Sequence, residues 1–276
     1  MKSKIPGLFN PMGAIRAICS NRFLVSQLTR REVESQFRGT FFGWIWLFAR
    51  PLLQLSVYTF VFGVLWRRDG SGEPIGSFAL QLFCGLSLYN LLSQVISKSS
   101  GCVAGKQAFV KQLVFPLEIL PWVQLLTATI MSLPWFVLLA GGLYLVYGHL
   151  PLTALLFPLW LIPLLLLAAG CSWFFAALGV YVRDLRQLMP VLLQMLFFVS
   201  PVFWQFSFLT GRKAQLIPYL RLNPLATIIE ESRKLLIFGE MTDWRLWGIS
   251  MLAGAVVFHL GFVWFQKTRK GFADVI

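Results

Sequence analysis

The chain has 276 residues, of which 57% are hydrophobic and only 13% are charged, and its formal net charge is +13. Because soluble domains carry about 25% charged residues, this composition excludes an ordinary soluble domain and indicates an integral membrane protein. An excess of Lys and Arg is typical of membrane-protein loops that face an anionic leaflet. Here the excess is spread over several loops, so we expect no nucleic-acid partner.

The opening residues and the cysteines argue against three further features. The stretch MKSKIPGLFNPMG contains two lysines, but Pro6, Gly7 and Pro11 interrupt any apolar core, so we expect no cleavable signal peptide. The four cysteines form no C-x-x-C pair, and we expect neither a disulfide nor a metal site.

Six stretches are apolar enough to cross a bilayer as helices, a crossing that takes about 20 residues. The expected spans are Phe41–Trp66, Phe78–Ile96, Leu120–Tyr147, Leu152–Tyr181, Leu188–Trp204 and Leu246–Phe265. Gly148 and Pro151 separate the third span from the fourth. The sequence therefore predicts an all-α integral membrane fold, with a six-helix domain over residues 41–266 between an N-terminal segment, 1–40, and a tail, 267–276.

The distribution of positive charge predicts the orientation. Six crossings leave both termini on one side of the membrane. With the N-terminus inside, the inner segments hold about twice as many Lys and Arg as the outer ones, which is the bias of cytoplasmic loops. We expect both termini to be cytoplasmic.

The outer segment, residues 206–243, is too polar to span and too apolar for a free loop. Asn223 is suited to cap a helix, Pro224 to occupy its first turn and Gly239 to end it. On a helical wheel Leu225, Ile228, Ile229, Leu235 and Leu236 fall on one face, opposite Thr227, Glu230 and Lys234. Two interpretations stay open: a helix at or dipping into the outer interface, or an ordinary surface helix packed on the bundle.

Catalytic and ion-coupling groups are not expected within the spans. The two histidines form no H-E-x-x-H motif, and no carboxylate cluster lies in a span. Ion-coupled carriers place ionisable groups at mid-membrane, and these spans carry none there. The energy for any transport must therefore come from a partner.

The stretch SSGCVAGKQ, residues 99–107, resembles half of a phosphate-binding loop. The loop needs Gly where Ser100 stands and Ser or Thr where Gln107 stands, and it follows a buried strand rather than a membrane span. We expect this chain itself to bind neither ATP nor Mg²⁺.

Two inner segments between spans, residues 97–118 and 179–188, could contact a partner. Their charged residues are Lys98, Lys106 and Lys111 in the first and Arg183, Asp184 and Arg186 in the second. The alternative is that these are solvated loop charges that obey the positive-inside pattern. Glu118, at the inner edge of the third span, is expected to cap that helix or to pair with a basic loop residue.

Five segments in linked order resemble the membrane subunit of a type-2 ABC exporter. They are TRREVESQFRGTFFGWIWLFARPLLQLSVYTFVFGVLW (29–66), VKQLVFPLEILP (110–121), GVYVRDLRQLMPVLLQMLFFVSPVFW (179–204), LNPLATIIEESRKLLIFGE (222–240) and WFQKTRKGFADVI (264–276). Within that superfamily the chain is most similar to the Wzm-like permeases that export lipid-linked O-antigen polysaccharide. Capsule and teichoic acid permeases are near relatives.

This resemblance implies a bacterial inner-membrane homodimer of six-helix permeases joined to two copies of a separate ABC ATPase subunit. ATP and Mg²⁺ would bind on that partner. Each permease would begin with an interfacial helix, roughly residues 12–37. Residues 97–111, with Gln107, and 182–187 would be the coupling elements that contact the ATPase.

A lipid-linked polysaccharide presents sugar faces, a diphosphate and a long lipid. Because sugars stack on aromatic rings, the candidate path residues are Trp44, Tyr58 and Phe62 of the first span and Gln194, Phe197, Phe198 and Trp204 of the fifth. Tyr58 and Phe62 share a helix face, as do Gln194 and Phe198. The alternative is that these rings face lipid or pack internally.

Three arginines approach the inner leaflet, namely Arg31, Arg38 and Arg50. Their guanidinium groups suit bidentate contact with the diphosphate. Snorkelling to phospholipid headgroups explains them equally well.

Two other functions remain as alternatives. A membrane enzyme acting on lipid-linked sugars would need an acid or base such as Asp184 or the Glu230–Glu231 pair. An exporter of drugs or small lipids would share the fold. We expect the permease.

Overall fold

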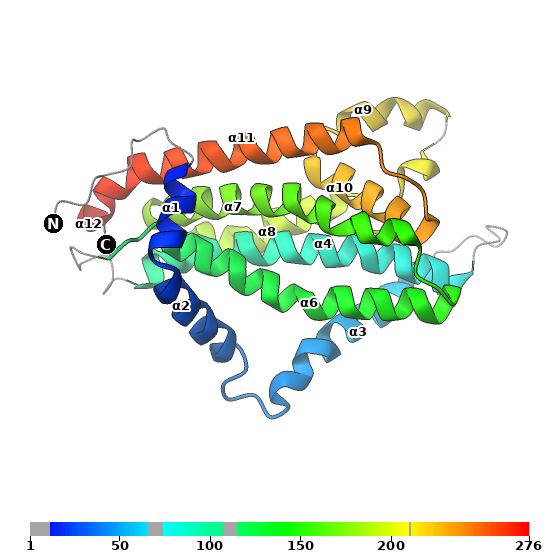
Figure 1. Ribbon diagram of the computed structural model, residues 1–276, viewed down its shortest axis with the longest axis horizontal. Helices are drawn as coiled ribbons and strands as arrows, with labels where there is room; N and C mark the ends of the chain where they lie inside the picture. The colour runs from blue at the N-terminus through cyan, green and yellow to red at the C-terminus, as the bar shows by residue number, and fades with distance from the viewer. Residues whose placement is uncertain (1–11, 66–73, 107–114, 210, 276) are drawn as a thin grey trace.

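The structure is a computed structural model that describes residues 12–65, 74–106, 115–209 and 211–275 (Figure 1). All regular elements in those residues are helices, and the part of the chain that the structure describes contains no strand. The predicted all-α class is therefore confirmed.

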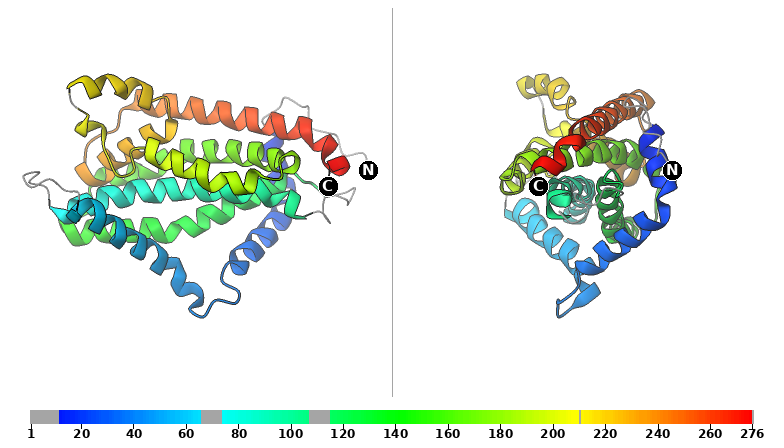
Figure 2. Two further views of the ribbon diagram at one scale, coloured as in Figure 1. Left: turned by 180° about the vertical axis from the view of Figure 1, so that it is seen from behind. Right: turned by 90° about the vertical axis from the view of Figure 1, so that its left-hand side faces the viewer.

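Four helices form the body of the molecule and run lengthwise beside one another (Figures 1 and 2). They are α4 (Ile75–Cys102), α6 (Ile119–Tyr147), α7 (Phe157–Tyr181, preceded by a 3-10 turn over Leu152–Leu156) and α11 (Trp244–Thr268). Each is long and apolar enough to cross a membrane. These helices correspond to the second, third, fourth and sixth expected spans.

The helices at the first and fifth expected spans are shorter than the sequence predicts. The first is α3 (Trp46–Tyr58), continued by a π-helix over Thr59–Leu65, and the fifth is α8 (Leu185–Val199). We expected the fifth span to reach Trp204, but Ser200 is extended, with ψ 145°. The reason is Pro201, because the residue before a proline disfavours helical geometry.

The N-terminal segment contains two helices where one was expected. These are α1 (Met12–Ser20) and α2 (Arg22–Ser35). The helix breaks at Asn21, whose ψ is 24° and whose amide Nδ2 donates to the Ala17 carbonyl at 2.9 Å. Val25 of α2 packs against the start of α6, so α2 lies against the bundle at one end.

The most extensive contact between two helices joins α7 to α11. Gly170 of α7 and Gly261 of α11 face each other so closely that a Cβ on Gly261 would overlap the Gly170 carbonyl. A Cβ on Gly170 would meet the backbone of Val257. Small residues allow this approach, which is common between membrane helices. Next to it, Trp173 packs edge-on against Phe258.

In the outer segment, the residues that cap and end the helix are those that the sequence predicts. Helix α10 spans Pro224–Arg233, with the Asn223 side chain accepting from the Leu225 amide at 3.1 Å, and it continues as a π-helix over Lys234–Phe238. Gly239 ends it at φ 65°. A 3-10 turn over Phe206–Phe208, another over Gly211–Leu216 and the short α9 (Ile217–Leu220) precede α10.

Helix α10 is buried on more of its surface than an amphipathic surface helix, which buries only its apolar face. The predicted apolar face is buried, and α10 packs against α4, α7 and α11. Thr227, expected on the polar face, is also buried, as are Glu231 and Arg233. The helix is therefore an internal part of the bundle.

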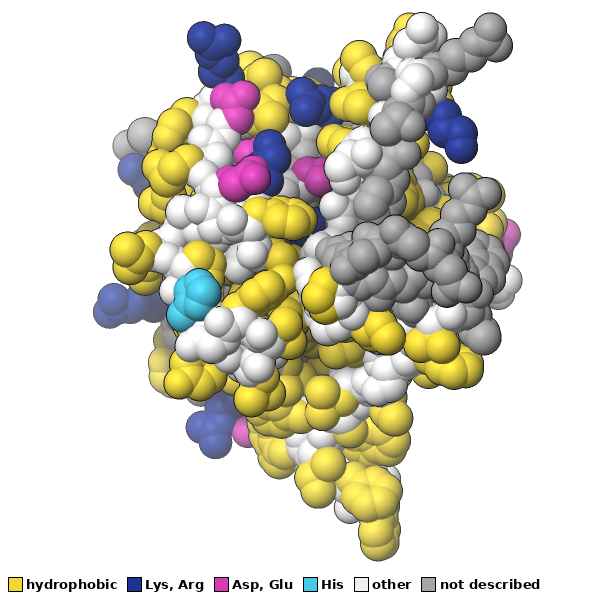
Figure 3. Space-filling model, turned by 90° about the vertical axis from the view of Figure 1, so that its right-hand side faces the viewer, with side chains coloured by type: hydrophobic (Ala, Val, Ile, Leu, Met, Phe, Trp, Pro, Cys, Tyr) yellow, Lys and Arg dark blue, Asp and Glu magenta, His cyan; other side chains and the backbone are white. Residues whose placement is uncertain are grey.

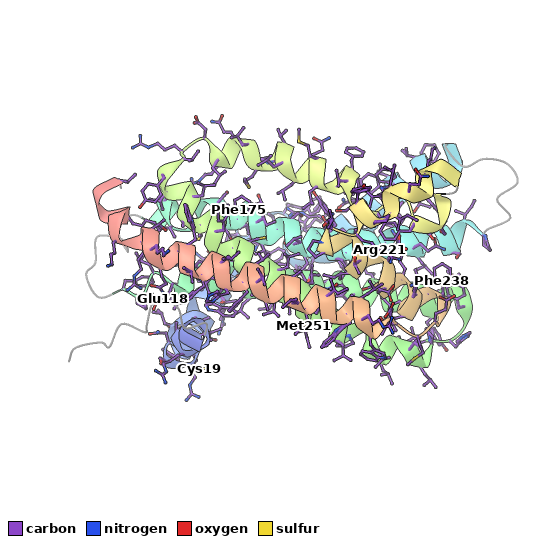
Figure 4. All side chains as sticks on the ribbon, turned by 90° about the horizontal axis from the view of Figure 1, so that it is seen from above. Cys19, Glu118, Phe175, Arg221, Phe238 and Met251 are labelled. Atoms are coloured by element: carbon purple, nitrogen blue, oxygen red, sulfur yellow. The ribbon has the colours of Figure 1, made fainter. Side chains whose placement is uncertain are left out.

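The first and last described helices, α1 and α12 (Phe272–Val275), lie at the same end of the bundle (Figure 1). We call this the inner end; it also contains α2 and the turn between α7 and α8. The opposite end, which contains α10, is the outer end. Figure 4 shows Glu118 at the inner end, and Arg221 and Phe238 at the outer end.

Candidate functional sites

The stretch that resembles half of a phosphate-binding loop continues a helix. Helix α4 runs through Cys102, so Ser99, Ser100 and Gly101 are helical, and a 3-10 turn over Ala104–Lys106 follows. A phosphate-binding loop instead wraps its glycines around phosphate before a helix begins. The geometry of this stretch thus differs from that of a nucleotide cradle.

One hydrogen bond joins the two inner segments that the sequence singles out. Arg186 Nη2 donates to the Gly101 carbonyl at 2.9 Å, linking the start of α8 to the end of α4. A side chain on Gly101 would collide with that guanidinium. Arg183 and Asp184 are exposed in the turn before α8. This arrangement connects the exposed turn to a long helix of the bundle.

The remaining predicted coupling residues lie partly outside the described structure, and the one whose side chain is described is half-buried. Lys106 has a described backbone but no described side chain, and Gln107 and Lys111 lie outside the described residues. Lys98 is half-buried on α4, and its Nζ is buried without a hydrogen-bond partner in the described part of the chain.

A pocket of about 560 Å³ opens beside Lys98 at the inner end. Helices α2, α4 and α6 and the start of α8 form its walls. Its charged lining residues, within the described chain, are Glu32, Lys98 and Arg186. We name this the inner pocket.

Three of the predicted path residues meet in an aromatic cluster between α3, α4 and α8. The rings of Tyr58 and Phe197 stack at 5.8 Å between centroids, and Phe198 contacts Phe197 edge-on at 5.4 Å. Tyr89 of α4 also contacts Phe197, and its hydroxyl donates to the Leu193 carbonyl at 2.7 Å. Phe203 closes the cluster against Phe197 and Phe198.

Sequence reasoning missed Tyr89 and Phe203. A signal for Tyr89 existed, because a tyrosine within a span needs a partner for its hydroxyl.

Of the other predicted path residues, Trp44 and Gln194 lie apart from this cluster, and Trp204 contacts its backbone. Trp44 stacks on Phe37 at 4.6 Å, before α3 begins. Gln194 is exposed on α8, and Trp204 donates its indole N–H to the Phe198 carbonyl at 3.3 Å. The side chain of Phe62 lies outside the described residues.

The three arginines proposed for the diphosphate are all exposed, and the described contacts do not bring them together. Arg50 lies over the Trp46 ring, with 5.9 Å between its Cζ and the ring centroid. Arg31 lies on α2 and Arg38 in the turn that follows it.

At the outer end, Arg233 of α10 is fully buried, and each of its three side-chain nitrogens donates at least one hydrogen bond. Its Nε donates to the Gln81 carbonyl at 2.9 Å, and its other nitrogens donate to the carbonyls of Val202 and Trp204 and to Glu230 Oε1. A buried guanidinium is tolerated only with such compensation. Sequence reasoning missed this residue, although it follows Ile229 by four positions and so shares the apolar side of the helix.

The adjacent carboxylates are also satisfied. Glu231 accepts from Thr242, from the Asp243 amide and from Lys234 Nζ at 2.6 Å. Glu230 accepts from the Phe206 amide at 3.2 Å. Burial raises the pKa of Glu230 above its ordinary value, and the attraction of Arg233 opposes this only in part.

A smaller pocket, of about 290 Å³, lies beside these residues, and we name it the outer pocket. Figure 3 shows that acidic and basic side chains gather on the upper part of the outer end. The lower projection, where Figure 1 shows α3 and the turn before it, is largely hydrophobic. No group of three or more potential metal ligands occurs among the described residues.

Glu118 pairs with a basic residue that is distant in sequence. Its carboxylate forms an ion pair with Arg269 and accepts from Gln266, both near the C-terminal end of α11. It makes no capping hydrogen bond to α6. Of the two expected roles, pairing is the one observed, but the partner comes from the tail rather than from a nearby loop.

Comparison with known proteins gives a consistent result. The family model for the ABC-2 type transporter matches residues 24–237. The O-antigen export system permease protein RfbA of Myxococcus xanthus is 25% identical over 267 residues, covering 95% of this chain and 98% of its own. A protein of the same name from Klebsiella pneumoniae is 23% identical, covering 92% and 95%. The polysialic acid transport protein KpsM of Escherichia coli is 25% identical, covering 79% and 83%. The chain therefore belongs to the ABC-2 type transporter family.

Proposed function

We propose that this chain is the permease subunit of an ABC exporter that moves a lipid-linked polysaccharide of the O-antigen type across the bacterial inner membrane. The observation that carries the proposal is the similarity to O-antigen export permeases over more than nine-tenths of both chains. The long apolar helices give the chain the means to reside in a membrane.

The aromatic cluster supports a saccharide path. Tyr58 and Phe198 pack around the buried Phe197 and bring rings and one hydroxyl together without a charged group, a combination that suits contact with the C–H faces and hydroxyls of sugars. Phe198 is 52% exposed, so its ring is accessible from outside the chain.

In the proposed assembly two copies of the chain pack together, and each crosses the membrane six times with both termini cytoplasmic. The apolar side chains of α3 and α8 are exposed in the single chain, which supports a covering by lipid or by the second copy. The inner end then faces the cytoplasm, and α10 enters the bundle from the outer face as a re-entrant segment.

ATP hydrolysis takes place on a separate ABC ATPase subunit in this proposal. The coupling surface consists of the exposed turn with Arg183 and Asp184, together with the segment from Lys106 to Lys111. Arg186, bonded to Gly101, connects that surface to α4. A push on the turn would therefore reach a helix that contributes to the aromatic cluster.

Cells that lack the chain test the proposal. We expect polysaccharide to accumulate inside and surface glycan to disappear. Unchanged surface glycan with new drug sensitivity would instead favour the exporter of drugs or small lipids. Chemistry on lipid-linked sugars by the isolated chain, abolished by Asp184→Asn, would favour the membrane enzyme.

The coupling surface has its own test. In the co-purified complex, Arg183→Ala combined with Asp184→Ala should lower ATPase retention and polysaccharide export together, because the exposed charges then no longer pair with the partner. Arg245→Ala, an exposed arginine at the outer end, is the control. Normal assembly and export with the double substitution would show that the surface lies elsewhere.

A further inference from the structure

The inner pocket combines positive charge with polar atoms that the protein leaves unpaired. Lys98 Nζ and Gln36 Nε2 are buried donors with no hydrogen-bond partner in the described chain, and both residues line the pocket. Gln124, which is 3% exposed, also lines it, and its Oε1 is buried and unpaired. A buried polar atom without a hydrogen-bond partner is energetically costly, and the cost is greater when the group is charged. Three such atoms around one pocket indicate a missing ligand.

The chemistry of the lining defines that ligand as an anion. Lys98 and Arg186 contribute two positive charges, against one carboxylate, Glu32, among the described lining residues. Rotation of a carboxamide exchanges its oxygen and nitrogen, so Gln124 can also donate. Ammonium, guanidinium and amide donors that converge on one space are the donor set of phosphate sites.

The location of the pocket favours a phosphate carried by a lipid. Lys98 lies one turn before the end of α4, an apolar helix long enough to cross the membrane, and α2 covers the pocket from the side. In the orientation proposed above, this is the level of the inner-leaflet headgroups. A carboxylate on the ATPase is disfavoured because Lys98 is recessed between helices, whereas Arg183 and Asp184 are exposed.

We propose that the inner pocket binds the phosphate or diphosphate group of a lipid, with Lys98 as the central contact and Gln36, Gln124 and Arg186 around it. The inference rests on the proposed function for its orientation in the membrane. It assigns Lys98 to a ligand rather than to the ATPase, and it differs from the exposed site of Arg31, Arg38 and Arg50.

Binding of polyprenyl diphosphate labelled in its phosphates, by the full-length chain in phosphatidylcholine nanodiscs, tests this site. Lys98→Met should weaken binding at least about tenfold, because a hydrogen bond to a charged group contributes about 1.5–3 kcal/mol. Lys98→Arg should restore most of it. Lys270→Met, an exposed lysine at the same end, should change affinity less than about twofold and is the matched control.

Competition separates the sources of the phosphate. Displacement by phosphatidylglycerol supports a general headgroup site, while displacement by inorganic pyrophosphate but not by phosphatidylglycerol supports a diphosphate site. Displacement by polyprenol, which has no phosphate, would overturn the proposal. Equal affinity of Lys98→Met and the unchanged chain would also overturn it. If Lys98→Met binds lipid normally but no longer retains the ATPase, Lys98 belongs to the partner contact.

Two further measurements keep the result decisive. If Lys98→Met does not fold, Gln124→Glu adds a negative charge to the pocket and should weaken binding in the same assay, and unchanged binding would overturn the proposal. Export in cells is measured separately. If the purified chain binds lipid in a Lys98-dependent way but cells that lack the chain show no polysaccharide defect, the pocket is retained and the proposed function is rejected.

Discussion

Arg233 at the outer end and Lys98 at the inner end are both cations on helices packed inside the bundle, but only Arg233 has its hydrogen bonds filled by the protein. Its guanidinium meets three backbone carbonyls and Glu230. The ammonium of Lys98 is buried and has no hydrogen-bond partner in the described chain.

This contrast separates structural from functional charge in this protein. A buried cation whose nitrogens all bond to the protein fixes a segment, and in this case Arg233 fastens α10 to α4 through the Gln81 carbonyl. A cation that faces a pocket with its donors unused keeps its binding capacity for something else. At the outer end the buried cation therefore stabilises the fold, whereas at the inner end the buried cation, which has no hydrogen-bond partner among the described residues, remains free to bind a ligand.

Loss of the hydrogen-bond network around Arg233 should destabilise the protein more than any other change considered below. Arg233→Met should lower the free energy of unfolding by about 3–5 kcal/mol, because Glu230 and several carbonyls lose a buried partner. Unfolding followed in mixed micelles measures it. Arg221→Met is the control, since Arg221 is exposed and lies over the Phe206 ring. Equal stability of the two variants would show that Arg233 does not fasten α10.

A smaller effect is expected from an arginine ion pair at the inner end. Arg269→Ala removes the partner of Glu118, but the Arg269 side chain is 30% exposed, so water replaces much of the interaction. We expect a loss of about 1 kcal/mol in the same unfolding assay. Lys270→Ala, the exposed neighbour, should change little. A loss as large as that of Arg233→Met would remove the contrast between the two ends.

The smallest expected effect is a pH dependence confined to the outer end. The pKa of Glu230 is raised in the folded chain above its ordinary value of about 4.5, so the folded state holds the proton more tightly than the unfolded state. Its contribution to stability is therefore greatest at low pH, and it falls as the pH rises from that ordinary value through the raised pKa.

Stability curves against pH for Glu230→Gln measure this contribution. The variant should lose the Glu230 part of the slope, while Glu240→Gln, an exposed residue lining the same outer pocket, should retain it. A slope unchanged in Glu230→Gln would assign the pH dependence to other groups.

Much of the fold was predictable because its signals are local. Uninterrupted apolar runs predicted the four long helices, and Gly148, at φ 74°, ends α6 where the sequence indicated. The punctuation of α10 by Asn223 and Gly239 was likewise correct. The end of α8 was wrong because apolar composition continues past Val199, whereas Pro201 determines the backbone.

The sites were less predictable, because they depend on contacts between distant segments. Tyr58 and Phe197 were expected in one path, and their rings do stack. Nothing in the spacing indicates that Arg233 reaches Gln81, 152 positions earlier, or that Lys98 faces Gln124 across a pocket. Lys98 was assigned to the partner surface from its charge and from the family resemblance, and neither reveals the direction of a side chain.

The contact of Gly170 with Gly261 sets the alignment of two long helices by the absence of atoms. Sliding α11 along α7 by one residue would bring Leu260 or Phe262 opposite Gly170, where the two backbones leave no room for a side chain. The position of α11 along α7 therefore depends on glycine at both positions, because any other residue would add a Cβ to this contact. The same position sets the level at which Arg269 meets Glu118.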